Sequence, residues 1–420
     1  MLKQYFKQAL NMLRENRLIS MVSILGTALS IAMIMIVVLV FQIQSANFLP
    51  ETHRDRMLYV EEGTEVSDSN NSRNSGSMSV EAVKECFYTL KTPEAVSAWF
   101  NFTYPLSLPG KQMYKIYSIK YTDTDFWKIY DFSFLGGKPF SEADFTSAIT
   151  QAVVSESVAR KLYGTVEVTG KPIIIDRIAY TICGVVKDVS RAADTSFADV
   201  WVPYTTNAFI LGITQMENMA GPFSTCILAR SRSDFDTIRK ELAQQTARYN
   251  ATKQDCRISF LENPITRFDR AIGSVGQRKV ALKDYLLETG GLLLFLLLVP
   301  ALNLIGVTQS SVQKRRAEMG LRKAFGATRG TLIRQLLCEN FLVTLLGGAI
   351  GLILSLLLLP ACKNFLLQKT DTALNSDMLF QPGIFLSALL FCLLLNLLSA
   401  GIPALRVSRQ PITNALKGDE

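Results

Sequence analysis

The chain has 420 residues, of which 49% are hydrophobic and 19% are charged. Soluble proteins typically contain about 25% charged residues, so this composition argues against a disordered or fibrous chain and disfavours an ordinary soluble one. Lysine and arginine total 44 against 36 acidic residues, giving a net charge of +8. The single histidine, His53, excludes a histidine-based zinc cage and an HExxH metalloprotease motif.

The first 17 residues predict an amphipathic helix. At helical spacing, one face collects the apolar residues Leu2, Tyr5, Phe6, Ala9, Leu10 and Leu13. Lys3, Lys7 and Arg14 lie off this face. Such a helix lies in a membrane interface. The alternative is a simple cytoplasmic extension of the apolar segment that follows.

Four windows contain no charged residue: 18–50, 289–313, 340–362 and 378–405. About 20 apolar residues cross a bilayer as a helix, because a helix satisfies its own backbone groups. We therefore predict transmembrane helices at 18–43, 289–311, 339–360 and 383–405. The alternative, buried helices of a large soluble core, is disfavoured because soluble helices normally keep a polar face. The first window is too long for the apolar part of a signal peptide.

The distribution of charge predicts the topology. Lys and Arg gather in residues 1–17, in the loop 312–338 and in the tail 406–420, whereas 44–288 contains 28 basic and 29 acidic residues. By the positive-inside rule, both termini and the 312–338 loop are cytoplasmic. Segments 44–288 and 361–382 are then extracytoplasmic. The basic excess is a topology signal, so nucleic-acid binding is not expected.

Segment 44–288 is long enough for a folded domain. Its patterns predict helices at 93–100, 155–163 and 234–249, and a mobile polar surface loop at 63–79. Alternating apolar residues in 171–187 predict a hairpin that turns at Asp176–Arg177. The fold class is therefore an α-helical membrane protein with four transmembrane helices (1+3) and a large α+β domain inserted between the first and second.

Four cysteines lie in this segment: Cys86, Cys183, Cys226 and Cys256. An oxidising exterior permits disulfides between them, with three possible full pairings. No CxxC spacing occurs, so a metal or redox site is not expected, and free buried thiols are the favoured state.

The sequence lacks the usual catalytic motifs. It contains no GxxxxGK[ST], GxSxG or HExxH pattern. We predict no catalytic residue, no metal site and no cofactor bound by this chain. Gly347 and Gly351 form a GxxxG pair in the third predicted span, which predicts close helix packing.

The loop after the second predicted span carries the most specific pattern, RAEMGLRKAFGATRG at 316–330. Its glycines at 320, 326 and 330 predict a short helix between turns, with an apolar patch at Leu321 and Phe325. On its own, this segment could also be a basic loop that only sets the topology and touches lipid headgroups.

The motif is similar to that of FtsX-like permeases, the membrane subunits of MacB-type ABC transporters that work by mechanotransmission. The tail IPALRVSRQPITNALKGDE resembles the end of the same family, although Asn414 and Lys417 replace its common acidic residue and arginine. The stretches YTDTDFWKIYDFSFLGGKPFSEAD, AVVSESVARKLYG, YTICGVVKD and DVWVPY are similar to its periplasmic core domain. Met319 and Phe325 stand where isoleucine and leucine are usual.

The resemblance implies that 312–338 is a coupling loop that docks on a cytoplasmic ABC ATPase. The docking residues would be Arg316, Glu318, Gly320, Leu321, Arg322, Lys323, Ala324, Phe325, Gly326 and Ala327. Because the chain begins at the interfacial helix, the ATPase, with its ATP and Mg, is expected on a separate subunit.

The same resemblance implies a second permease copy, identical or paralogous, in a bacterial inner membrane. The expected function is efflux or export of periplasmic substrates, with a periplasmic adaptor and an outer-membrane channel as possible partners. The alternatives are an FtsX-like regulator of an extracytoplasmic enzyme and a lipoprotein-releasing permease. A membrane-embedded enzyme is disfavoured by the missing catalytic motifs.

Overall fold

A computed structural model describes a subset of the chain. The described residues are 21–36 except 23, 30 and 34, then 47–67, 73–110, 115–213, 221–253, 256–260, 263–271, 328–366 and the single positions 283, 287, 386, 390, 393 and 394. The predicted interfacial helix at 1–17 and the docking residues at 316–327 lie outside them. So do nearly all of the predicted spans at 289–311 and 383–405.

The contacts divide the chain into two compact units. The first comprises residues 1–43, 283–370 and 374–420, and the second comprises 44–282 and 371–373. No helix among the described residues combines the length and the apolar composition that a membrane crossing requires. The number of membrane spans stays a prediction.

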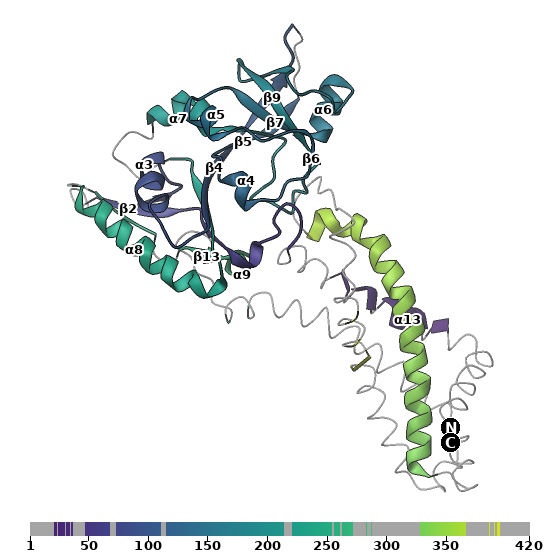
Figure 1. Ribbon diagram of the computed structural model, residues 1–420. Coiled ribbons are helices and arrows are strands. Elements are labelled where there is room, and N and C mark those ends of the chain that lie inside the picture. Colours follow the sequence, from purple (N-terminus) through teal and green to yellow (C-terminus); the bar gives the residue numbers. More distant parts are fainter. Residues whose placement is uncertain are drawn as a thin grey trace. The chain divides into compact units, whose positions relative to one another are not determined.

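The second unit is built on a mixed β-sheet (Figure 1). Its strands are β1 (Met57–Val60), β4 (Ala95–Ser107), β5 (Ile116–Thr122), β6 (Phe134–Gly137), β7 (Gln151–Ser155), β8 (Pro172–Ile175), β9 (Ile178–Val186), β10 (Val200–Pro203), β11 (Ser224–Leu228) and β13 (Ile265–Thr266). They follow the order β13-β1-β11-β4-β5-β10-β7-β9-β6, and β8 pairs with β4 and β9. The pairs β5–β10 and β7–β9 are parallel.

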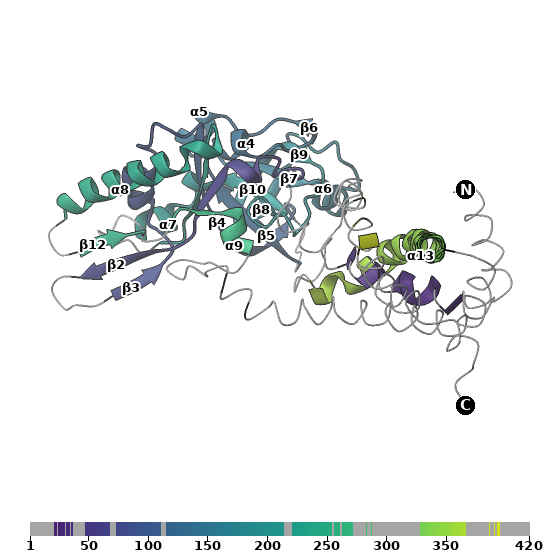
Figure 2. The same cartoon turned by 90° about the horizontal axis from the view of Figure 1, so that it is seen from below.

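A smaller sheet has the order β12-β2-β3. Its strands are β2 (Gly63–Ser67), β3 (Arg73–Gly76) and β12 (Cys256–Ser259). Two views show helix α8 (Phe235–Ala251) running beside this sheet (Figures 1 and 2). The α+β character expected of this segment is therefore confirmed.

The other helices with labels are short, apart from α13 in the first unit. They are α3 (Val80–Ala82), α4 (Phe126–Ile129), α5 (Glu142–Thr146), α6 (Glu156–Tyr163), α7 (Ala208–Ile213), α9 (Arg267–Ala271) and α13 (Arg329–Leu366), with a π-helix η2 (Val83–Phe87) and 3-10 turns η1 (Arg54–Arg56), η3 (Tyr204–Thr206) and η4 (Arg232–Asp234). One core cluster packs both sheets against α8, α6 and η2. Within it, Phe100 stacks on Tyr121 with 4.7 Å between the ring centroids.

Three sequence predictions for local structure are confirmed. The helix expected at 234–249 is α8, and the helix expected at 155–163 is α6, which ends at Gly164 with a φ of 76°. The hairpin is β8–β9, in which Ile175 pairs with Ile178 and Asp176 and Arg177 have φ of 45° and 68°. Two consecutive positive φ angles are those of the type I′ turn that matches strand twist.

The helix predicted at 93–100 is wrong, because these residues open the central strand β4. Ala95 to Phe100 are all buried, between β11 on one side and β5 on the other. A short apolar run buried on both faces shows no period that separates a strand from a helix. The partners that decide between them, β5 and β11, come later in the sequence.

The polar loop predicted at 63–79 is also wrong over its described residues. It contains β2 and β3, which pair from Gly63 with Gly76 to Val66 with Arg73. Strand β12, almost 190 residues later, pairs with the other edge of β2. Backbone hydrogen bonds from these neighbours outweigh the poor strand propensity of a Ser/Asn-rich sequence.

Helix α13 corrects one detail of the predicted coupling loop. Gly330 was expected to interrupt a helix, but α13 starts at Arg329 and runs through it. The hydroxyl of Thr328 accepts a hydrogen bond from the Thr331 N–H at 3.3 Å, which is an N-cap contact. A glycine in the first turn costs the helix little, because the capping residue already holds that turn.

Candidate functional site

Of the residues predicted from the sequence to have a site role, the structure describes Gly347 and Gly351. Both are buried on α13, and both contact the helix formed by the described residues between 21 and 36, which we call the 21–36 helix. A Cβ atom added to Gly351 would lie 2.6 Å from the carbonyl oxygen of Ala28. One added to Gly347 would lie 2.8 Å from Cγ2 of Thr27. Only glycine fits at these two positions without displacing the neighbouring helix.

The second unit begins and ends in two segments that lie side by side. The N-terminal linker, residues 47–56, leads into β1, and the C-terminal linker, residues 263–271, contains β13 and α9. Strands β1 and β13 pair, with Leu58 opposite Thr266 and Tyr59 opposite Ile265. Strands β1 and β13, which belong to these two ends of the described unit, therefore lie together at one edge of the large sheet (Figure 1).

Ionised side chains, of which Glu51, Arg54 and Arg267 are buried and the others half-buried, join both linkers to one loop of the domain, between β9 and β10. We call this set the charge cluster, and its members are Glu51, Arg54, Glu61, Asp194, Arg267 and Arg270. Asp194 belongs to the β9–β10 loop, and Glu61 directly follows β1. The charges balance, because three carboxylates face three guanidinium groups.

The N-terminal linker is attached to the loop through Glu51. Its carboxylate accepts hydrogen bonds from Arg54 Nε at 2.5 Å, from the Thr195 hydroxyl at 2.7 Å, and from the backbone N–H and hydroxyl of Ser196 at 3.0 and 2.8 Å. Burial alone would raise the pKa of Glu51, but Arg54 and Arg267 hold that pKa below its ordinary value. Arg54 also donates to the Ala192 carbonyl at 3.1 Å.

The C-terminal linker is attached to the same loop through Asp194. One oxygen of this carboxylate accepts hydrogen bonds from Arg267 Nη1 at 3.0 Å and Arg270 Nη1 at 2.9 Å. Arg270 Nη2 lies 2.6 Å from Glu61 Oε1. Burial lowers the pKa of Arg270, but Asp194 and Glu61 more than offset this and raise it above its ordinary value. Residues 192–196 thus hold both linkers at once.

The fully buried ion pair between Glu51 and Arg54 is sensitive to the loss of either partner. Removing one ion leaves the other buried and uncompensated, which typically costs about 3–5 kcal/mol. The cluster therefore keeps the two linkers in a fixed relation to each other and to the β9–β10 loop. Among the described residues, its side chains pair with one another and with the backbone of residues 192–196.

Lys120 on β5 is a further basic side chain beside the cluster, and it would be a fourth cation when protonated. The side chain is fully buried, and its Nζ has no hydrogen-bond partner among the described residues. Burial lowers the pKa of Lys120 to about 7, although Asp194 and Glu51 favour its charged form. The ammonium lies 5.2 Å from the ring centroid of Trp99. Protonation of Lys120 places an unbalanced charge next to a cluster that is otherwise neutral.

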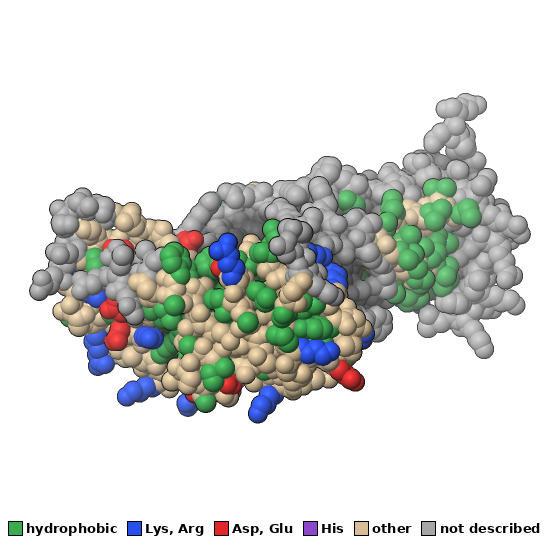
Figure 3. Space-filling model, turned by 90° about the horizontal axis from the view of Figure 1, so that it is seen from above, with side chains coloured by type: hydrophobic (Ala, Val, Ile, Leu, Met, Phe, Trp, Pro, Cys, Tyr) green, Lys and Arg blue, Asp and Glu red, His purple; other side chains and the backbone are tan. Residues whose placement is uncertain are grey.

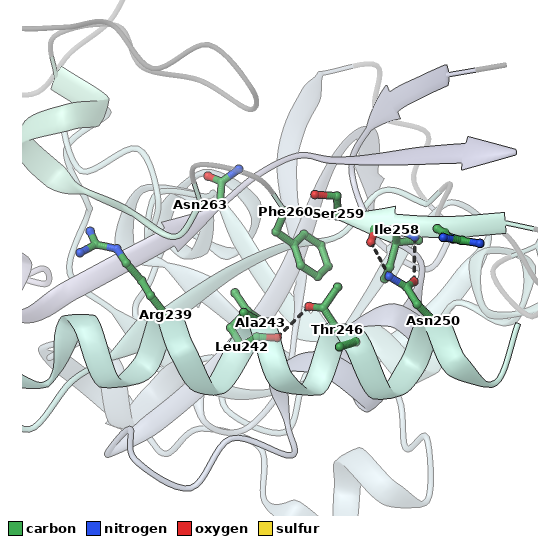
Figure 4. Close-up of a pocket in the computed structure, with 11 residues that line it drawn as sticks. Arg239, Leu242, Ala243, Thr246, Asn250, Ile258, Ser259, Phe260 and Asn263 are labelled. Carbon is green, nitrogen blue, oxygen red and sulfur yellow. Dashed lines mark hydrogen bonds between the residues drawn. The ribbon is translucent and has the colours of Figure 1, made fainter. Parts of the chain in front are cut away.

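A groove of about 680 Å³ lies between α8 and β12 in the second unit (Figure 4). Arg239 and Arg257 lie among its lining residues, and Leu242, Ile258 and Phe260 supply apolar surface. The Asn250 side chain exchanges two hydrogen bonds with the backbone of Ile258, at 2.8 and 2.9 Å. The amide of Asn250 thereby satisfies backbone groups on one edge of β12.

One face of the second unit can be examined for patches of charge. On the face in Figure 3, acidic and basic side chains are interspersed over the described part of the second unit. Such a mixed surface does not indicate a particular charged partner.

Sequence reasoning did not find the charge cluster. Asp194 is more than 140 positions from Glu51 and more than 70 from Arg267, so no local motif contains them. Each is an ordinary charged residue in its own stretch. A weak signal existed, because acidic and basic residues recur close to both ends of the inserted domain, but that signal does not name the pairs.

Comparison with known proteins gives two family matches. A family model described as the MacB-like periplasmic core domain matches residues 20–245, more than half of the chain. A second, described as the FtsX-like permease C-terminal, matches residues 290–412.

Individual relatives are distant. The "uncharacterized ABC transporter permease YknZ" of Bacillus subtilis is 24% identical over 216 residues, 51% of this chain and 50% of that protein. The macrolide export ATP-binding/permease protein MacB of Burkholderia lata is 26% identical over 286 residues, 67% of this chain and 38% of that protein. The chain thus spans half or less of the length of these relatives. The crystal structure of the extracellular domain of YknZ from Gram-positive bacteria is 16% identical and covers 48% of this chain and 99% of that chain, with a TM-score of 0.37.

Proposed function

Because the chain belongs to the family of MacB-like and FtsX-like ABC transporter permeases, we propose that it passes ATP-driven movement from a separate cytoplasmic ATPase to its periplasmic domain, for the export of periplasmic substrates. Members of this family are inner-membrane proteins with periplasmic domains, and their place in an ABC transporter implies an ATPase partner. The separate ATPase subunit, the direction of transport and the mechanical role are the steps that the proposal adds.

The observation that carries the proposal is the attachment of both linkers to residues 192–196. A domain that receives movement through its two connections needs those connections to be fixed to its core, because a loose linker would absorb the displacement. Glu51 supplies this attachment through buried charge-assisted hydrogen bonds, and Asp194 supplies it through half-buried ones. Such bonds are roughly twice as strong as neutral ones and have a defined geometry.

The ATPase partner is proposed to dock on Arg316, Glu318, Gly320, Leu321, Arg322, Lys323, Ala324, Phe325, Gly326 and Ala327. The 420 residues contain no GxxxxGK[ST] motif, so ATP and Mg are expected on the partner. Leu321 and Phe325 would insert, and Arg322 and Lys323 would pair with carboxylates across the interface. A second permease copy completes the proposed assembly.

Export is favoured over regulation of an external enzyme. Two relatives are named as macrolide export and pyoverdine export proteins, and these names support the proposal of export. The proposal therefore extends to a periplasmic adaptor and an outer-membrane channel as further partners. A regulator of the FtsX type and a lipoprotein-releasing permease are the less favoured alternatives.

The docking proposal is tested by co-purification. Phe325→Asp should abolish recovery of an ABC ATPase with the full chain from membranes while membrane insertion is unchanged. Phe209→Asp is the matched control, because Phe209 is an exposed phenylalanine, 74% accessible, in the second unit. Equal ATPase recovery with the wild type and Phe325→Asp would refute the docking assignment.

The attachment of both linkers by the charge cluster is tested in the full chain co-purified with its ATPase. Asp194→Asn should leave ATP hydrolysis intact but remove the ATP-dependent change in hydrogen exchange of the domain. The reason is that the C-terminal linker is then no longer held by Arg267 and Arg270. Asp236→Asn is the control, since its ion pair with Arg239 is on the surface. An undiminished ATP-dependent change in Asp194→Asn would overturn the mechanical role of the charge cluster.

A further inference from the structure

The contact between α13 and the 21–36 helix has a geometry that fits a single moving body. The Cβ positions of Gly347 and Gly351 are occupied by Thr27 and Ala28, and Ile31 Cβ would lie 3.1 Å from a Cβ on Gly351. Glycines let two helices approach closely, because no side chain separates the backbones. Sliding of one helix along the other would drive Thr27 or Ile31 against the side chains that flank the glycines.

The buried positions on the two helices form continuous faces. On α13 they include Thr344, Gly347, Gly351 and Ser355, spaced by three or four residues. On the 21–36 helix they are Thr27, Ala28, Ile31, Ala32 and Met35. Residues three and four apart share one side of a helix, so these positions lie on one face of each helix; Leu342 is buried as well, on another side of α13.

Helix α13 also begins next to the proposed docking motif. The motif ends at Ala327, Thr328 caps the helix, and Arg329 is its first residue. The helix then continues without a break for 38 residues, about 57 Å at 1.5 Å per residue. Displacement of the motif therefore moves the first turn of α13 directly, and an unbroken helix carries that displacement along its length.

From these observations we propose that α13 and the 21–36 helix move as one body, joined at Gly347 and Gly351, so that movement of the docking motif reaches the N-terminal linker through this pair. The inference rests on the proposed function for the origin of the movement. This path through α13 and the 21–36 helix differs from one in which the predicted span at 289–311 carries the movement from the docking motif directly to the second unit. Residue 36 is followed by only ten residues before the N-terminal linker begins, and Glu51 then joins that linker to the charge cluster.

The first test is a cross-link in the full chain in lipid nanodiscs, with Cys338, Cys362 and Cys392 replaced by alanine. The Ala28→Cys and Gly351→Cys pair should form a disulfide rapidly with copper phenanthroline as oxidant. The pair Ala28→Cys and Ile353→Cys is the control, because Ile353 is 58% exposed and points away from the contact. Absence of the first cross-link, or equal yield from both pairs, overturns the proposal.

The second test is hydrogen exchange of the same full chain. Gly351→Leu should force the helices apart and raise exchange by roughly tenfold or more, which is the effect expected of an overpacked contact. The rise should include α13, residues 21–36 and the N-terminal linker. Gly330→Leu is the matched control, since no atom lies within 4 Å of a Cβ at Gly330. If exchange rises only in α13, the two helices do not move as one body. If exchange rises in both helices but not in the N-terminal linker, the proposed path to that linker is wrong.

Neither readout needs the ATPase. If Phe325→Asp failed to affect ATPase recovery while the cross-link formed and exchange responded as expected, the docking assignment would fall and the helix pair would stand. In the opposite result, with docking supported and the cross-link absent, the helix pair alone would fall.

Discussion

Glu51 Oε2 and Arg54 Nε lie 2.5 Å apart, and neither side chain has any solvent exposure. The pair closes one turn of the N-terminal linker and presents the second Glu51 oxygen to Thr195 and Ser196. A buried pair contributes little net stability compared with an apolar replacement, but it is costly to break. Its value is geometric, because it fixes where the chain enters the domain.

Replacing Glu51 by glutamine should lower the free energy of unfolding of the second unit by about 3 kcal/mol, because Arg54 then remains buried without its counter-ion. Denaturant unfolding of the full chain, followed by tryptophan fluorescence, measures this unit selectively. All three tryptophans, Trp99, Trp127 and Trp201, lie within it. Glu94→Gln removes a surface ion pair with Arg56 and should cost less than about 1 kcal/mol, on the scale of exposed pairs. Similar losses in both variants would contradict the prediction.

Lys120 should make the domain less stable as the pH falls toward 7. Burial lowers the pKa of Lys120 in the folded state to about 7 from an ordinary value of 10.5. Between pH 7 and pH 10.5, Lys120 is therefore protonated in the unfolded state and largely neutral in the folded state. Stability attributable to Lys120 therefore increases with pH in this window, by about 1.4 kcal/mol per unit. Lys120→Met should remove this dependence and stabilise the protein.

The measurement is the free energy of unfolding between about pH 7 and pH 8.5, the lower part of the window in which the unfolded lysine is protonated. Above that range the buried thiols begin to contribute with the opposite sign, because burial raises the pKa of Cys86, Cys183 and Cys226 to about 12. If the free energy of unfolding of the wild type changed as little with pH as that of Lys120→Met across this range, Lys120 would be charged in the folded protein.

Cys86 and Cys226 should resist alkylation in the native protein. Both are buried and free, and burial raises their pKa to about 12. At about pH 8 the reactive thiolate is then rarer by a factor on the order of 1,000 than for a thiol of pKa about 9. Iodoacetamide labelling followed by peptide mass spectrometry should find both residues unmodified until denaturant is added. Prompt labelling of either residue in the native protein would refute its burial.

Arg177→Gly should stabilise the β8–β9 hairpin. Arg177 has a φ of 68°, in the left-handed region that costs most residues about 1–2 kcal/mol and glycine almost nothing. Asp-Gly is a preferred type I′ turn sequence, so a gain of about 0.5–1 kcal/mol is expected in unfolding by denaturant. Arg177→Ala removes the same side chain but keeps the strain. If both variants gained equally, the gain would come from the lost arginine and not from the turn.

The family could be predicted from the sequence because its features are local. The docking motif at 316–327 and the apolar windows are contiguous stretches, and helices such as α8 show their period within one stretch of chain. The turn at Asp176–Arg177 was likewise visible between two alternating strands. Each of these patterns expresses a preference of neighbouring residues, which can be detected without knowing the fold.

Strand pairing was predicted less well. Residues 95–100 and 63–67 gave the wrong structure because their state depends on partners far along the chain, namely β11 for β4 and β12 for β2. Long-range backbone hydrogen bonds decide between states that the local sequence leaves nearly equal in free energy.

By itself, the amino-acid sequence determined the class of protein, the positions of its apolar segments and the order of the domains along the chain, because each of these is a property of one contiguous stretch. Only the tertiary structure brought Asp194 to Arg267 and Arg270, and Gly351 to Ala28. Those contacts join residues that lie far apart in the sequence. Their formation depends on the packing of the whole unit, which no single stretch of sequence encodes.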